Sequence, residues 1–159
     1  MKAASSQVNP IFPAISSLFL RNSQCYDTYR KMIEVKKIPP KGRGIVATKL
    51  IPKKTLIEVA PVSSFPRQQW KYVKQIDIFK YCFVTPLEYK ESKAGQGHIV
   101  FGLSSLCNHS ENPNAFIKWE HNEIGLWAHL IALGDIQSGE EVLIFYTNID
   151  EYPSESNFI

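Results

Sequence analysis

The segment Gly102-Leu103-Ser104-Ser105-Leu106-Cys107-Asn108-His109-Ser110-Glu111-Asn112-Pro113-Asn114-Ala115 is the most informative stretch of this chain. It lies between two runs of β-branched and aromatic residues that are typical of strands, at 98–101 and 115–119. Its Asn, His, Ser and Pro residues fill a core poorly but form hydrogen bonds readily. For Asn108-His109-Ser110 alone, the simpler interpretation is a turn in which Asn and Ser bond to nearby backbone.

Two further motifs flank this segment, Gly42-Arg43-Gly44 before it and Gly139-Glu140-Glu141-Val142-Leu143-Ile144-Phe145-Tyr146 after it. Taken alone, the glycine pair is weak evidence, because glycine at many surface turns serves only to permit a positive φ. Its chemical use would be to let bare backbone approach a ligand. A tyrosine that ends a strand, such as Tyr146, is most often a residue at the edge of the core.

Taken together and in this order, the three motifs resemble the SET-domain family of protein-lysine methyltransferases. The resemblance extends over about residues 32–148 and implies a mainly β, SET-type fold. We therefore expect several small sheets, few short helices and a pseudoknot-like C-terminal segment. The cysteine-rich zinc segments that many family members carry on either side of the domain are not found in this sequence.

The resemblance also implies an S-adenosylmethionine site, which the family builds from the glycine turn and the Asn-His pair. The expected cofactor-binding residues are Gly42, Arg43, Gly44, Asn108 and His109. Asn108 would bind the amino-acid part of the cofactor and His109 would border the adenine. Tyr146 and Tyr81 are the expected catalytic residues, Tyr146 at the methyl-transfer point and Tyr81 as a wall of the lysine channel. One aromatic residue of the tail, Tyr152 or Phe158, is a candidate to close that channel.

Composition limits the classes of protein to which the chain can belong. With 159 residues, 44% hydrophobic and 21% charged, the chain suits one globular domain, which at this size buries about 70% of its unfolded surface. No run approaches the ~18 apolar residues of a membrane span, and Pro10 and Pro13 interrupt the early apolar patches, which disfavours a secretory signal. We expect an intracellular protein, cytoplasmic or nuclear.

Cysteine usage agrees with an intracellular location. Cys25, Cys82 and Cys107 are scattered and form no CxxC pair, so we expect neither a disulfide framework nor a metal site. The remaining histidines lack the spacing of metal ligands.

Charge is polarised along the chain. Residues 1–54 hold 11 Lys and Arg against 2 Asp and Glu, whereas residues 106–159 hold 1 against 9. The plain interpretation is segregated solvated faces. The functional one is a cationic surface near the cofactor end and an acidic one that attracts cationic substrates.

The chain divides into an N-terminal extension at 1–24, rich in Ser, Asn and Pro, and a single SET-like domain at 25–159 with a short C-terminal tail. We expect a hairpin with a four-residue loop at 120–123, a short helix at 66–75 and a loop at 92–97. The predicted strands are 32–36, 44–48, 55–60, 81–84, 98–101, 115–119, 124–128 and 142–146.

Three functions stay open at this point. The first is methyl transfer from S-adenosylmethionine to a lysine of a protein substrate, a histone or another basic protein. The second is a catalytically inactive SET-like protein-binding module. The third is a nucleic-acid-associated protein that uses the basic first third with Tyr26, Tyr29 and Arg30, although we expect no direct nucleic-acid binding and no membrane association. A homodimer through residues 1–24 is also left open.

Overall fold

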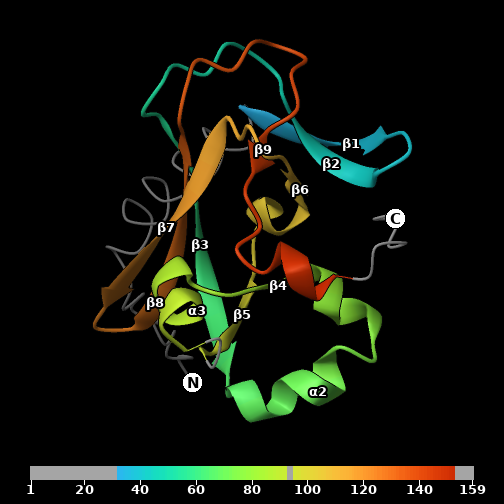
Figure 1. The fold of residues 1–159 in the computed structure, drawn as a ribbon. Coiled ribbons are helices and arrows are strands. Elements are labelled where there is room, and N and C mark those ends of the chain that lie inside the picture. Colours follow the sequence, from blue (N-terminus) through green and yellow to red (C-terminus); the bar gives the residue numbers. More distant parts are fainter. Residues whose placement is uncertain (1–31, 93–94, 153–159) are drawn as a thin grey trace, which may run out of the picture.

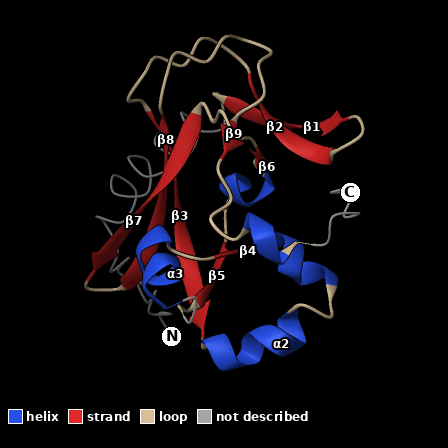
Figure 2. Ribbon diagram, viewed as in Figure 1, coloured by secondary structure: helices blue, strands red, loops and turns tan. Residues whose placement is uncertain are grey.

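The computed structural model describes residues 32–92 and 95–152. In these ranges strands dominate and the helices are short (Figures 1 and 2). The strands are β1 (Ile33–Ile38), β2 (Gly42–Ala47), β3 (Leu56–Phe65), β4 (Cys82–Phe83), β5 (Gly97–Val100), β6 (Asn108–His109), β7 (Ala115–Asn122), β8 (Gly125–Ala132) and β9 (Leu143–Ile144). The α-helices are α2 (Trp70–Val73) and α3 (Pro86–Ser92). The 3-10 helices are Arg67–Gln69, Asp77–Tyr81, Leu103–Leu106 and Ile149–Glu151. The predicted mainly β fold class is confirmed.

The strands form three sheets. An antiparallel sheet of five strands has the order β4-β5-β3-β8-β7, and β1 pairs with β2 in a separate hairpin. The third sheet joins β6 to β9 in parallel, with Asn108 opposite Leu143 and His109 opposite Ile144. On its other side the C-terminal segment bonds to β2, since Val142 N–H donates to the Ile45 carbonyl at 2.8 Å. The third sheet therefore brings all three sequence motifs together.

The main hydrophobic core takes its residues from all three sheets. Its fully buried side chains are Ile45, Ile51, Ile57, Leu130, Ile136, Ile144 and Val142, and burying each contributes about 1.5–3 kcal/mol. A second apolar cluster, built on Trp70 and Phe79, packs the helical segment 67–81 with Cys82, Val84 and Tyr89. This cluster fixes the end of that segment, and with it Tyr81.

The structure corrects several predicted boundaries. Tyr81 ends a 3-10 helix instead of starting a strand, and β4 contains two residues only. The helix predicted at 66–75 is confirmed by Arg67–Gln69 and α2. Helix α3 was not predicted, although Thr85 and Pro86 mark its start and the Thr85 hydroxyl donates to the Glu88 carboxylate at 2.9 Å across its first turn.

The β7–β8 hairpin is also tighter than expected. Its loop has two residues, Glu123 and Ile124, because Asn122 pairs with Gly125, so the predicted four-residue loop is wrong. Gly125 has a φ of 135°, a conformation that favours glycine. The Asn122 side chain accepts hydrogen bonds from Ile124 N–H at 3.0 Å and from the Trp127 indole at 3.1 Å, which fixes this turn.

The predicted extension 1–24, and Phe158 with it, lie outside the described residues. No helix within the described ranges has the length and apolar character needed to cross a membrane.

Candidate active site

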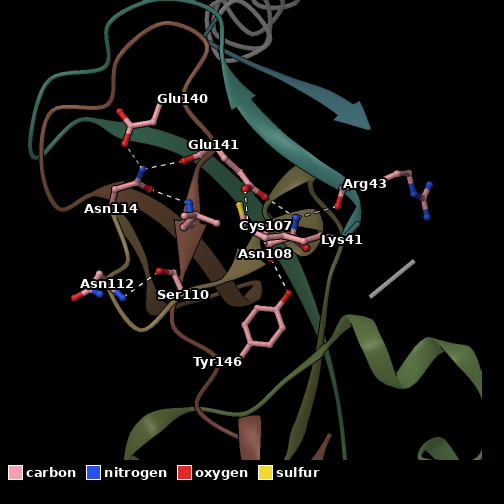
Figure 3. Close-up of polar contacts among 11 residues, drawn as sticks. Lys41, Arg43, Cys107, Asn108, Ser110, Asn112, Asn114, Glu140, Glu141 and Tyr146 are labelled. Carbon is pink, nitrogen blue, oxygen red and sulfur yellow. Dashed lines mark hydrogen bonds and ion pairs between the residues drawn. The ribbon is translucent and has the colours of Figure 1, made fainter. Parts of the chain in front are cut away.

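Asn108 is the centre of the polar network between β2, β6 and the C-terminal segment (Figure 3). Its buried side-chain amide donates to the Glu141 carboxylate at 2.6 Å and to the Arg43 carbonyl at 3.2 Å. The Lys41 ammonium contacts the other Glu141 oxygen at 2.9 Å. Glu141 thus joins the glycine motif to the Asn-His motif, and the amide of Asn108 is fixed in orientation.

The two glycines of the first motif are needed for different reasons. Gly42 has a φ of 90°, in the region that other residues rarely adopt. Gly44 is required by space: a Cβ there would lie 2.7 Å from Ile38 Cγ1, 2.8 Å from Asn108 Nδ2 and 2.9 Å from Glu141 Oε1. The bare backbone at Gly44 is therefore what lets Asn108 and Glu141 meet.

Tyr146 lies just after the end of β9. Its N–H donates to His109 Nδ1 at 3.0 Å, and its hydroxyl donates to the Cys107 carbonyl at 2.7 Å. Burial is the main cause that raises the pKa of this phenol well above its ordinary value, with nearby Tyr152 adding to it. Tyr146 therefore stays protonated in the physiological range and acts as a hydrogen-bond donor.

Tyr146 also lines two cavities. A small one, of about 20 Å³, lies on the side of the glycine motif and is lined by Lys41, Arg43, Lys80, Tyr81, Ser105, Leu106, Asn108 and Tyr146. The Arg43 guanidinium donates to the Tyr81 hydroxyl at 2.9 Å beside it. A larger one, of about 200 Å³, is also lined by Tyr146. Its walls are mostly apolar and include Phe83, Val84, Pro86, Ile117, Trp119, Phe145 and Tyr152.

Tyr152 forms one wall of the larger cavity from the C-terminal segment. Its ring lies 5.7 Å from the ring of Tyr146 and 4.9 Å from that of Phe79. The neighbouring Glu151 carboxylate holds this segment against the helical segment by accepting from the Trp70 indole at 2.9 Å, from Lys74 at 3.2 Å and from Arg67. We call this group of side chains the Glu151 clasp.

Not every predicted site residue lines a cavity. Arg43, Asn108, Tyr81 and Tyr146 surround the small one. The ring of His109 instead packs against Phe145 and Tyr146, at 5.2 and 5.4 Å between ring centroids, and orients Tyr146 through its Nδ1 atom. The predicted cofactor contacts of Gly42, Arg43, Gly44, Asn108 and His109 stay predictions.

Two carboxylates essential to this geometry were missed by the sequence reasoning. Glu141 was quoted only as part of a motif. Glu58, in β3, accepts from the backbone N–H groups of Leu103 and Ser104 at 2.8 and 2.7 Å and so anchors the start of the Asn-His segment. A lone charged residue in an otherwise apolar strand was the available signal. Within residues 32–92 and 95–152, no group of His, Cys, Asp and Glu side chains could hold a metal ion.

Comparison with known proteins decides the family. The SET-domain family model matches residues 42–147, which begin at the glycine motif and end just after Tyr146. The chain belongs to the SET-domain family. Among SET-domain relatives, a histone-lysine N-methyltransferase of Schizosaccharomyces pombe, specific for H3 lysine-37, is 30% identical over 117 residues, 74% of each chain. Protein-lysine N-trimethyltransferase SMYD5 of Danio rerio is 49% identical over 51 residues, which are 32% of this chain and 12% of that protein.

Solved SET-domain structures share the fold. A Plasmodium falciparum protein assigned as a histone methyltransferase superposes with a TM-score of 0.55 and 25% identity, over 73% of this chain and 93% of that one. The Neurospora histone lysine methyltransferase DIM-5 superposes with a TM-score of 0.56 at 15% identity, over 78% of this chain and 54% of that chain.

Proposed function

We propose that this chain is an S-adenosylmethionine-dependent protein-lysine N-methyltransferase. The single observation that carries the proposal is that Tyr146 lines two cavities, one beside the glycine and Asn-His motifs and one with mostly apolar walls. Methyl transfer needs two such cavities at one residue, because donor and acceptor approach the same point from opposite sides. Membership of the SET-domain family and relatives named as lysine methyltransferases support the same function.

The residues around the small cavity fit S-adenosylmethionine. The Arg43 carbonyl and the fixed amide of Asn108 offer polar partners for the amino-acid part of the cofactor. When bound, the cofactor supplies a methyl group made electrophilic by a positively charged sulfur. The cavity has room for only about one water-sized group. The cofactor would therefore need the lining side chains, Arg43 and Tyr81 among them, to move on binding.

The chain's own part in the reaction is positioning. Tyr146, kept neutral by burial and bonded to the Cys107 carbonyl, presents oxygen dipoles to a cationic methyl donor, and carbonyl oxygens make weak C–H···O contacts with such groups. Fixing two reactants in line supplies several kcal/mol of the barrier. Tyr81 lies across the small cavity from Asn108 and is proposed as a wall at the transfer point.

The larger cavity prepares the acceptor. A free lysine amine has a pKa of about 10.4, and only its neutral form attacks. Apolar walls such as Phe83, Trp119 and Tyr152 disfavour the charged ammonium and exclude water, which lowers the pKa of a lysine that enters. The proton leaves to solvent before transfer, since Tyr146 is already protonated.

We further propose a histone or another basic protein as substrate. The Schizosaccharomyces pombe relative is named for a histone lysine, and such a substrate fits the predicted intracellular location. The inactive binding module is less favoured, because the transfer-point tyrosine and its hydrogen-bond partner are both in place.

Incubation of the full chain with S-adenosylmethionine labelled in the methyl group, together with core histones, tests the proposal. We expect label on histone with the native chain and at least about a hundredfold less with Tyr146→Phe, since removal of one positioned donor costs about that much. Calorimetry separates the alternative: a chain that binds the cofactor but labels neither histones nor other basic proteins is the binding module.

A further inference from the structure

A second groove, of about 530 Å³, continues from the larger cavity between α3 and the face of the five-stranded sheet. The groove and the cavity share two wall residues, Pro86 and Trp119. A polypeptide whose lysine occupies the cavity beside Tyr146 therefore meets this groove as it leaves. The inference rests on the proposed function and concerns the residues that flank the target lysine.

Strand β7 gives the spacing between the two sites. Ile117, Trp119 and His121 alternate along the strand and face the same side of the sheet. Ile117 lines the cavity, His121 lines the groove and Trp119 lines both. Four residues of a strand span about 13 Å, so an extended substrate reaches from one site to the other in about four residues.

The groove contains a buried polar atom that makes no hydrogen bond within the described residues. The His98 side chain is only 3% exposed, and its Nδ1 atom shares a hydrogen bond with the Ser64 hydroxyl at 2.9 Å. Its Nε2 atom has no hydrogen bond within the described residues and faces the Glu88 carboxylate at 3.7 Å, too far for a bond. Burial lowers the pKa of His98, against the opposing influence of Glu88, so the ring is neutral at physiological pH.

Charge and shape together define what fits. Glu88 supplies the one carboxylate among the described residues that line the groove, and its side chain is 43% exposed. Trp119 offers an aromatic ring beside the ring of His98, at 5.2 Å between centroids. An arginine side chain stacks on aromatic rings and donates to several acceptors at once, which a lysine ammonium does less well.

We propose that this groove is a specificity site that binds an arginine side chain about four residues from the target lysine of the substrate. The guanidinium would pair with Glu88 and stack against Trp119, while the lysine lies beside Tyr146. Lysines with an arginine at that spacing are then the preferred targets.

A set of lysine peptides, each with one arginine placed in turn at each position around the lysine and alanine elsewhere, tests the site. We expect the lowest KM with the arginine about four residues away, on one side of the lysine. Glu88→Gln should raise that KM about fivefold with kcat unchanged, because a half-exposed ion pair contributes modestly. We expect the substitution to keep the fold, since a glutamine side-chain oxygen can still accept from the Thr85 hydroxyl.

Two controls make the outcome specific. Glu123→Gln removes the same charge on the exposed turn of the β7–β8 hairpin and should leave every KM unchanged. With an all-alanine peptide, Glu88→Gln should have no effect. Equal KM values for all arginine positions, or the same loss in Glu88→Gln with both peptides, would overturn the proposal.

Failure of the proposed function would be visible separately. The ring nitrogen signals of His98 in the NMR spectrum report on the groove without turnover. Addition of the arginine peptide should shift the Nε2 signal in the native chain, and in Glu88→Gln the same shift should need about fivefold more peptide, whether or not methyl transfer occurs. An unmoved Nε2 signal at saturating peptide would refute the arginine site. A moved signal without methylation would refute only the proposed methyltransferase function.

Discussion

Replacement of Glu151 by alanine should destabilise the C-terminal wall of the larger cavity. Its carboxylate is 11% exposed and accepts from the buried Trp70 indole, from Arg67 and from Lys74. Breaking a buried charge pair costs about 3–5 kcal/mol. The side chains of Arg67 and Lys74 are 19% and 38% exposed, so hydrogen bonds to water replace part of the lost interaction. We therefore expect a loss of about 2–3 kcal/mol.

Urea denaturation of native chain and Glu151→Ala measures this loss, and methylation kinetics measure its effect on the site. Because the clasp holds Tyr152 against Phe79, the KM for peptide should rise about tenfold while cofactor affinity stays the same. Asp77→Ala is the matched control, since that side chain is 96% exposed and its loss should change stability by less than about 0.5 kcal/mol. A Glu151→Ala protein as stable as the control, with unchanged KM, would refute the clasp.

The remaining predictions use the same assays. Gly44→Ala should lower cofactor affinity in calorimetry at least about tenfold and destabilise the fold by about 1–3 kcal/mol, because the added Cβ collides with Asn108 and Glu141; unchanged affinity would contradict the proposed role of Asn108 in cofactor binding. Glu58→Gln should lower the free energy of unfolding, measured in urea, by about 1–2 kcal/mol, since an amide cannot accept well from two N–H groups at once. An unchanged free energy of unfolding would argue against Glu58 as the anchor of the Asn-His segment. Burial alone would raise the pKa of Glu151, but its donors, Arg67 first, lower it overall. The clasp's contribution should therefore be complete above the ordinary carboxyl pKa of about 4.3 and disappear as pH falls below it. In pH-dependent melts the stability gap between native chain and Glu151→Gln should close there, and a constant gap would be the contrary result.

The sequence motifs were sufficient to predict which segments meet at the proposed site. The order of the glycine, Asn-His and Gly-Glu-Glu motifs predicted that distant segments meet, and the parallel pairing of β6 with β9 accounts for it in space. These motifs can be recognised in the sequence because few residues other than glycine at 44 and asparagine at 108 would fit at those positions. Most strands also follow from their β-branched residues, with errors at their ends, but β6, which lies in the segment interpreted as a turn, was not among the predicted strands.

Long-range side-chain partners could not be predicted. Glu58 and Ser104, or Arg67 and Glu151, are far apart in the chain, and nothing local indicates which carboxylate meets which donor. Tyr81 was misassigned to a strand because its neighbours are β-prone, whereas packing of Phe79 on Trp70 draws the preceding residues into a 3-10 helix. Tertiary packing outweighs local propensity at such short elements.

Tyr152 is a second residue whose position depends on long-range contacts that the sequence does not reveal. An aromatic residue of the tail was expected to close the channel, and Tyr152 lines the larger cavity. Only the contacts of its neighbour Glu151 explain why a short segment can hold that position. The role of Tyr152 in catalysis stays a prediction.

The most direct test of the central claim is tandem mass spectrometry of one histone after incubation with the full chain and isotope-labelled S-adenosylmethionine. The account predicts labelled methyl on a lysine side-chain nitrogen, its loss when that lysine is replaced by arginine, and its near absence with Tyr146→Phe. Label on another residue type, or equal labelling by Tyr146→Phe, would contradict it.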